Sequence, residues 1–173
     1  MGDAAASFEP PTLLTEAHDG SGFESGEPVL DAWLCQRALA NQRSGASRTY
    51  VVCRAGSLVV VGYAALSMGQ ILAQDVPGTM RRNMPKFIPA VLLGRLAVAR
   101  NAQGTGMGRA LLADMVRRAL LASAEVSARL VIVHAISPAA EAFYAWHGFT
   151  RLPVETPTLA LDLVKLCEVA EKG

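Results

Sequence analysis

The stretch Gln103-Gly104-Thr105-Gly106-Met107-Gly108-Arg109-Ala110 joins an apolar run, residues 91–98, to a segment with helical periodicity. Its three alternating glycines lack a Cβ atom, so a phosphate group can approach the backbone N–H groups closely. The first turn of the following helix adds unpaired N–H donors and the positive end of the helix dipole. The sequence therefore predicts a pyrophosphate-binding loop between a buried strand and a helix.

The spacing of the glycines excludes two common nucleotide-binding motifs. A dinucleotide fingerprint that starts at Gly104 requires glycine where Arg109 stands, and one that starts at Gly106 requires glycine where Leu111 stands. A nucleoside triphosphate loop requires Lys followed by Ser or Thr, and neither is present at that offset. The pattern that remains is Gln-x-x-Gly-x-Gly, and the alternative is a glycine-rich turn that serves packing alone.

Composition indicates a single globular domain over residues 1–173, with a loose N-terminal tail at 1–11 and a C-terminal tail at 165–173. The chain is 51% hydrophobic and 18% charged, which favours a domain rich in buried strands and argues against disorder. Its apolar runs are interrupted before the ~18 residues that a membrane span needs. We read no targeting signal at the N-terminus and expect a cytoplasmic protein without a membrane partner.

The charge and the cysteines exclude several further classes of protein. A net charge of +1 gives no overall signature of nucleic-acid binding, so a polyanion would have to meet a local basic patch. Three widely spaced cysteines without a C-x-x-C pair indicate neither a disulfide framework nor a zinc site. We therefore expect reduced thiols and no metal.

Periodicity and turn signals predict an alternation of strands and helices. A proline and Val29, Leu30, Trp33, Leu34 and Ala38 favour a helix over residues 28–42. Ser137 and Pro138 begin a later helix that Gly148 closes. Strands are expected at residues 12–14, 49–54, 58–67, 91–98, 130–134 and 159–164, with a helix after the glycine loop. Residues 74–89 read as a long basic loop.

A second motif, Ala142-Phe143-Tyr144-Ala145-Trp146-His147-Gly148-Phe149, lies one helix and one strand after the glycine loop. Together the two motifs resemble the GCN5-related N-acetyltransferase (GNAT) family, and the resemblance extends from about Leu30 to Leu163. It implies an α/β fold of the α+β type, in which a mixed, mainly antiparallel sheet carries helices on both faces and is splayed near Val98. It also implies acetyl-CoA as the cosubstrate.

The resemblance assigns roles to the residues of both motifs. The pantetheine arm of acetyl-CoA would pair with the backbone of Leu96, Ala97 and Val98, and Tyr144 would be the general acid that protonates the departing thiolate. A packing role beside Phe143 is the alternative for Tyr144. The pyrophosphate would contact Gln103, Gly104, Thr105, Gly106, Met107, Gly108 and Arg109.

The predicted strand 91–98 carries no Glu, Asp or His, although some relatives place a carboxylate there. At pH 7.4 about one lysine amine in a thousand is neutral, whereas about a fifth to a third of α-amines are neutral. An enzyme without a strong base therefore suits an α-amine. His134, at the end of its strand, could assist through water or serve the structure alone. His147 reads as a surface residue before the glycine that closes its helix, and His18 lies in the N-terminal loop.

Further segments, residues 30–34, 40–51, 62–63 and 93–98, resemble the acetyltransferase toxins of bacterial toxin–antitoxin pairs. Those enzymes acetylate the α-amine of aminoacyl-tRNA and are neutralised by a ribbon-helix-helix antitoxin, and a homodimer is expected. The net charge of +1 departs from the clearly basic charge that is expected of a tRNA-binding toxin. The candidate basic contacts, unless they are merely solvated, are Arg37, Arg43, Arg48, Arg81, Arg82, Lys86 and Arg95.

Two other functions stay open on the sequence. One is a small-molecule or peptide N-acetyltransferase of the same fold, which a basic loop facing away from the acceptor would favour. The other is an acetyl-CoA-binding module without turnover, in which Tyr144 only packs.

Overall fold

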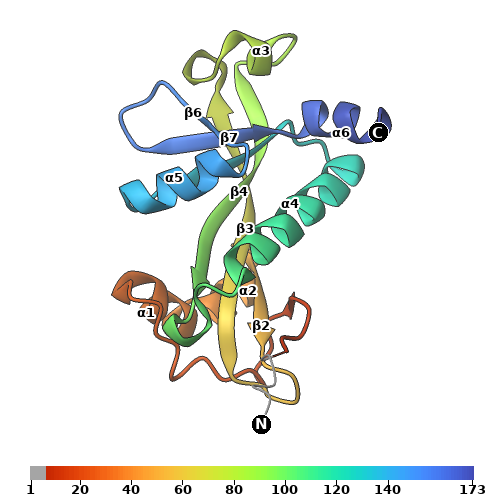
Figure 1. Cartoon of the computed structure of the whole chain (residues 1–173). Helices are drawn as coiled ribbons and strands as arrows, with labels where there is room; N and C mark the ends of the chain where they lie inside the picture. Colours follow the sequence, from red (N-terminus) through yellow and green to blue (C-terminus); the bar gives the residue numbers. More distant parts are fainter. Residues whose placement is uncertain (1–6) are drawn as a thin grey trace. The chain divides into compact units, whose positions relative to one another are not determined.

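The computed structural model describes residues 7–173, which form two compact units (Figure 1). Of the described residues, the first unit contains 7–66 together with Arg95–Met115, and the second contains Ser67–Gly94 and Val116–Gly173. Two strands and one helix, named below, run from one unit into the other. The single domain over residues 1–173 stays a prediction, and residues 1–6 of the expected tail lie outside the described residues.

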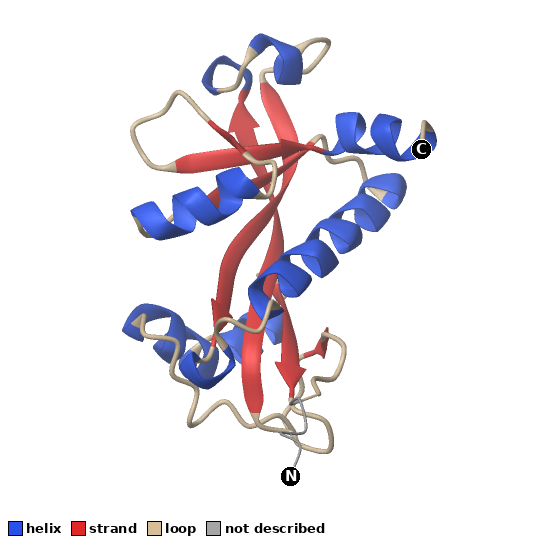
Figure 2. Cartoon of the chain, viewed as in Figure 1, coloured by secondary structure: helices blue, strands red, loops and turns tan. Residues whose placement is uncertain are grey.

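The first unit combines the N-terminal helices with one end of the sheet (Figure 2). Helix α2 contacts both α1 and β2. Its elements are β1 (Thr12–Leu13), α1 (Pro28–Gln36), α2 (Ala38–Ser44), β2 (Arg48–Cys53), the first part of β3 (Val60–Leu72), the last part of β4 (Phe87–Val98), η2 (Arg100–Ala102) and the first part of α4 (Met107–Glu125).

The second unit holds the remaining parts of β3, β4 and α4 and the C-terminal half of the chain. Helix α5 packs against β7, and α6 packs against β5. Its further elements are η1 (Ala73–Asp75), α3 (Gly78–Arg81), β5 (Leu130–His134), α5 (Pro138–Trp146), β6 (Thr150–Arg151), β7 (Thr158–Asp162) and α6 (Leu163–Glu171).

The strands follow the order β1-β2-β3-β4-β5-β7-β6 in one sheet. Antiparallel pairs join β1 to β2, β2 to β3, β5 to β7 and β6 to β7, whereas β4 and β5 run parallel. A parallel pair needs a crossover, and α4 lies between β4 and β5 in the chain. The mixed, mainly antiparallel sheet with its helices confirms the expected fold class.

An aromatic group fixes α1 in the first unit. Tyr63 of β3 is fully buried, stacks on Trp33 of α1 and meets Phe23 edge to face, with ring centroids 5.9 and 5.4 Å apart. Its hydroxyl donates a hydrogen bond of 2.6 Å to the carbonyl of Leu30. Burial raises the pKa of Tyr63, so this hydroxyl remains a donor at neutral pH.

The core of the second unit lies under one face of β4, β5 and β7. Ile88, Ala90, Leu130, Ile132 and Ala160 are buried together. Val76 and Met80, from the segment between β3 and β4, close this cluster. The segment 74–89, expected as an irregular loop, therefore carries a short helix and contributes to the core, and β4 already begins at Phe87.

Two other boundaries differ from the expected ones. The predicted helix 28–42 is broken at Arg37, whose φ of −126° and ψ of −34° lie outside the helical region. The expected C-terminal tail 165–173 is mostly helix α6, which Asp162 caps by accepting hydrogen bonds from the N–H groups of Val164 and Lys165. A polar cap before a run with helical spacing was the signal in the sequence.

The N-terminal segment is tied to the sheet where it is described. Phe8 forms a β-bridge with Arg54, and the N–H of Glu9 donates to the carbonyl of Cys53. The part of the expected tail that the structure describes is therefore not loose. Among residues 7–173, no helix is both long enough and apolar enough to cross a membrane.

Candidate active site

The glycine loop between η2 and α4 leaves open space above its backbone. Gly104 and Gly106 have φ values of +76° and +84°, which side-chain-bearing residues rarely adopt. A Cβ atom added at either position would meet no heavy atom within 4 Å. The loop is exposed, and α4, which follows it, is long enough to contribute N–H donors and a dipole.

Gln103 holds this loop to two neighbouring segments. Its Nε2 donates to the carbonyl of Val98 at 2.9 Å and to the carbonyl of Ser25 at 2.8 Å. Nearby, Arg100 pairs with Glu24 at 3.0 Å. The amide of Gln103 therefore fixes the distance between the end of β4 and the start of the glycine loop.

Met107, the first residue of α4, packs on a glycine of β3. It is 6% exposed, and its sulfur would lie only 2.7 Å from a Cβ atom on Gly62. The absence of a side chain at Gly62 thus allows the start of α4 to lie close to β3. This contact was not predicted, because an isolated glycine in a strand gives no indication of which residue covers it.

The end of β4 carries the residues expected to pair with pantetheine. Ala97 is buried, whereas Leu96 and Val98 are half-buried. The register of β4 with β5 ends at Leu93 opposite Val133, so Leu96, Ala97 and Val98 lie beyond it. Extended backbone past the end of a register, followed by a loop that no Cβ atom fills, fits an elongated pantetheine–pyrophosphate ligand.

Tyr144 lies on α5 in the second unit. It is 7% exposed, and its ring contacts Phe143 and Phe149 edge to face. Burial raises the pKa of Tyr144 to about 12, so the phenol keeps its proton at neutral pH. Ser137 caps α5, its Oγ accepting from the N–H of Ala140 at 3.1 Å. The side chain is thus rigidly packed and remains a proton donor.

The three histidines have different surroundings. His18 hydrogen-bonds Thr15 through Nδ1 at 3.0 Å, and Nδ1 of His147 lies 2.7 Å from the carbonyl of Phe143 and donates to it. Both contacts are local and stabilise a turn or a helix end. His134 instead lines a cavity and contacts Thr158 across the sheet.

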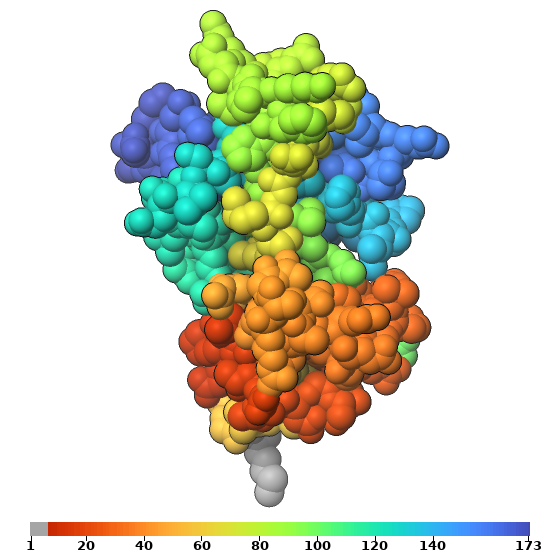
Figure 3. Space-filling view, turned by 180° about the vertical axis from the view of Figure 1, so that it is seen from behind, coloured from red at the N-terminus to blue at the C-terminus, as the bar shows by residue number. Residues whose placement is uncertain are grey.

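The candidate basic residues are divided between the units. Arg37, Arg43, Arg48 and Arg95 belong to the first unit, and Arg81, Arg82 and Lys86 belong to the second. The last three are exposed and belong to the short segment around α3, which is the yellow-green part of Figure 3. Because they lie within six residues of one another, these three exposed cations make this segment a candidate basic patch.

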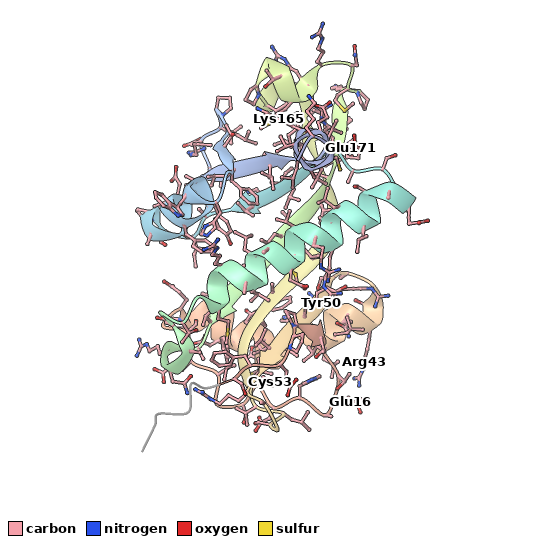
Figure 4. All side chains as sticks on the ribbon, turned by 45° about the vertical axis from the view of Figure 1, so that its right-hand side comes forward. Glu16, Arg43, Tyr50, Cys53, Lys165 and Glu171 are labelled. Carbon is pink, nitrogen blue, oxygen red and sulfur yellow. The ribbon has the colours of Figure 1, made fainter. Side chains whose placement is uncertain are left out.

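Two of the basic residues of the first unit have partners within it. Arg43 forms an ion pair with Glu16, and both side chains are labelled in Figure 4. The guanidinium carbon of Arg95 lies 5.2 Å from the centroid of the Trp33 ring, a cation–π contact. Arg95 thus contributes to the aromatic group that fixes α1. Arg37 and Arg48 are exposed.

None of the three cysteines is among the candidate site residues. Cys35 and Cys167 are exposed and Cys53 is buried, and all three are free thiols. Over residues 7–173, no group of three potential metal ligands occurs.

Comparison with known proteins identifies the family. Residues 45–151 match the acetyltransferase (GNAT) domain family. The chain is 43% identical over 154 residues to a tRNA-acetylating toxin of Mycobacterium tuberculosis, covering 89% of this chain and 92% of that protein.

Solved structures give the same result for the fold. AtaT in complex with acetyl-methionyl-tRNAfMet superposes with a TM-score of 0.88 at 28% identity, covering 95% of this chain and 99% of that one. A tyrosine-to-phenylalanine variant of AtaT, bound to acetyl-CoA and to the C-terminus of the antitoxin AtaR, gives 0.80 at 27% identity, covering 96% and 99%. The chain thus belongs to the GNAT acetyltransferase family and is an acyltransferase that uses acetyl-CoA.

Proposed function

We propose that this protein is a toxin that transfers the acetyl group of acetyl-CoA to the α-amine of aminoacyl-tRNA. The observation that carries the proposal is the 43% identity, over nearly the full length of both chains, to a tRNA-acetylating toxin. The likeness to AtaT, solved with an acetylated aminoacyl-tRNA, supports it. An acetylated α-amine is no longer a nucleophile, so the product cannot accept a peptide, and translation stops.

The site residues have the following roles in this proposal. Leu96, Ala97 and Val98 pair with the pantetheine arm, and residues 103–109 bind the pyrophosphate with their N–H groups. Acetyl-CoA supplies an activated thioester when bound. Tyr144 donates a proton to the departing sulfur, and its raised pKa means that the phenol still holds this proton at neutral pH.

The tRNA meets the basic patch of Arg81, Arg82 and Lys86 and the exposed Arg37 and Arg48. Arg43 and Arg95 contribute less, because the first is paired with Glu16 and the second stacks on Trp33.

The remaining partners follow from the same likeness. We infer that an antitoxin neutralises this chain, since AtaT has been solved with the C-terminus of the antitoxin AtaR. A ribbon-helix-helix antitoxin, a homodimeric toxin and a cytoplasmic location are the specific forms that we propose.

Incubation with radiolabelled acetyl-CoA and a mixture of aminoacyl-tRNAs tests the function. Label is expected on charged tRNA, is lost on alkaline deacylation and falls with added salt. Label confined to free amines or to peptides would instead establish the small-molecule or peptide acetyltransferase. Binding of acetyl-CoA without transfer to any amine would indicate instead an acetyl-CoA-binding module without turnover.

A further inference from the structure

The second unit contains a cavity of about 350 Å³ on the face of its sheet. Ile71 of β3, Leu92 of β4, Ile132 of β5 and Val154 give it an apolar wall. Leu92 lies four residues before Leu96 in the same strand, so the cavity wall and the predicted pantetheine segment are parts of one element. A cavity of this size, with an apolar wall and a few polar groups, is typical of a small-ligand site.

The charged residues that line this cavity are carboxylates. Asp75 and Glu155 contribute them, and the remaining ionisable group of the lining is His134. Two carboxylates lower the local potential and attract a cation. An acceptor that arrives as an α-ammonium ion fits this lining, and its side chain fits the apolar wall.

His134 is held in one tautomer by its neighbour across the sheet. It lies opposite Thr158 in the register of β5 and β7, and its Nδ1 is 3.0 Å from Thr158 Oγ1. The same hydroxyl donates to the carbonyl of Thr156 at 3.0 Å. A hydroxyl has one hydrogen, so both contacts are satisfied at once only when Nδ1 of His134 carries a proton and donates it to Thr158.

The other ring nitrogen of His134, Nε2, is then unprotonated. In a neutral imidazole protonated on Nδ1, Nε2 carries a lone pair and accepts a proton. Thr158 is 3% exposed and packed within the sheet, so it holds the ring in a fixed orientation. His134 itself is exposed to the cavity that it lines.

We propose that this cavity receives the aminoacyl group of the acceptor and that His134 is the general base that deprotonates its α-ammonium, with Thr158 as a positioning residue. This inference rests on the proposed function. It accounts for the absence of a carboxylate or histidine on residues 91–98 of β4.

The α-ammonium gives one proton to Nε2 of His134, which later releases it to solvent. The freed lone pair of the nitrogen forms the bond to the acetyl carbon, and the carbon–sulfur bond of the thioester breaks. The sulfur takes a proton from Tyr144, and the second proton lost by the nitrogen restores the tyrosine. The products are the amide and free coenzyme A.

Single-turnover acetylation by H134Q and H134A, with saturating acetyl-CoA, tests the base. General bases contribute about 10²–10⁴-fold, so we expect a loss of about 10²-fold at pH 7. The loss shrinks towards pH 8.5, where more of the α-amine is already neutral. Added imidazole restores part of the rate of H134A. The affinity for acetyl-CoA is unchanged, and H18Q, a matched substitution in the first unit, keeps the full rate.

The cavity and the positioning residue have their own tests. T158V keeps the volume of the side chain but removes the contact to Nδ1, and we expect a smaller loss of kcat than in H134A, without a change in KM. L92W narrows the cavity and D75N with E155Q removes its charges. Both raise KM for the acceptor and leave the affinity for acetyl-CoA unchanged.

The outcomes separate this inference from the proposed function. Rates of H134Q and H134A within threefold of wild type at every pH, or no rescue by imidazole, would overturn the assignment of His134. If the wild-type enzyme labels a free amine and leaves charged tRNA unlabelled, the proposed function fails, and the same variants are then tested on that amine.

Discussion

The guanidinium of Arg129 and the carboxylate of Asp162 form a two-point ion pair, with Nε to Oδ1 at 2.9 Å and Nη2 to Oδ2 at 2.8 Å. The same carboxylate caps α6, and Nη2 of Arg129 also donates to the carbonyl of Thr79 at 3.3 Å. Arg129 precedes β5, so one mostly buried pair joins the start of that strand to α6 and to α3.

Removal of one partner of this pair should destabilise the protein strongly. Asp162→Asn leaves the mostly buried guanidinium without its counter-charge, and we expect a loss of about 3–5 kcal/mol in the free energy of unfolding. Urea denaturation measures it. Glu171→Gln, an exposed carboxylate at the end of α6 labelled in Figure 4, is the control and should cost little. Similar midpoints for both variants would show that the pair contributes nothing.

The pair also predicts a pH dependence of stability. Burial alone would raise the pKa of Asp162, but the hydrogen bonds from Arg129, Lys165 and Val164 and the guanidinium charge outweigh it and lower that pKa. A folded pKa below the unfolded value of about 3.9 gives stability that is present above pH ~4 and lost as the pH falls through the folded pKa. As the pH falls below ~4, the free energy of unfolding should fall less steeply with pH for Asp162→Asn than for the wild type. Equal slopes for the two proteins would contradict the assignment.

Gly106→Val should abolish tight acetyl-CoA binding, because the new side chain occupies the space through which the pyrophosphate approaches. Gly56→Val is a matched control, since Gly56 also has a positive φ and open space around its Cβ position. Both variants should lose about 1–3 kcal/mol of stability from backbone strain. Calorimetry should show weakened binding in the first alone, and equal affinities would mean that the pyrophosphate binds elsewhere.

Tyr144→Phe should keep the affinity for acetyl-CoA and lose most of the turnover. The ring contacts to Phe143 and Phe149 persist, and only the proton donor is removed. We expect a loss of about 10²–10⁴-fold in kcat. With a pKa of about 12, the phenol does not titrate between pH 6 and 9, so the wild-type rate has no alkaline limb from Tyr144 in that range. Relief of growth arrest when the variant is expressed in bacteria provides an independent measurement. A rate within threefold of wild type would indicate that Tyr144 serves packing alone.

Neutralisation of Arg81, Arg82 and Lys86 should weaken tRNA binding and flatten its salt dependence. Each phosphate contact that is lost reduces the slope of log K against log salt by about 0.7–0.9. The neutral variant of Lys172, an exposed cation at the end of the chain, should leave the slope unchanged. Equal slopes for the triple variant and the wild type would indicate that the tRNA binds to another surface.

The sequence predicted those parts of the fold whose signals are local. Strand β5 matches the predicted residues 130–134, and α5 begins after Ser137 and ends before Gly148 as expected. Propensity and capping act over a few residues, so a single sequence shows them. The break at Arg37 and the short strand β6 have no such local signal, because tertiary packing decides them.

The candidate site shows the same limit. Alternating glycines predicted the open loop, since positive φ at Gly104 and Gly106 is a property of the residues themselves. The contact of His134 with Thr158 joins residues 24 positions apart, and only the register of β5 and β7 reveals it. The pairing of Arg43 with Glu16 likewise decides which arginines remain available, and composition alone does not show it.

The chain has two tryptophans, and each compact unit contains one of them. Trp33 stacks on Tyr63 beneath Arg95, whereas the side chain of Trp146 is 87% exposed at the end of α5. Their fluorescence therefore differs in emission maximum and in accessibility to a soluble quencher. The tryptophan emission of a variant without Trp146 comes from the first unit alone, which makes the unfolding of that unit optically separable from the unfolding of the rest of the chain.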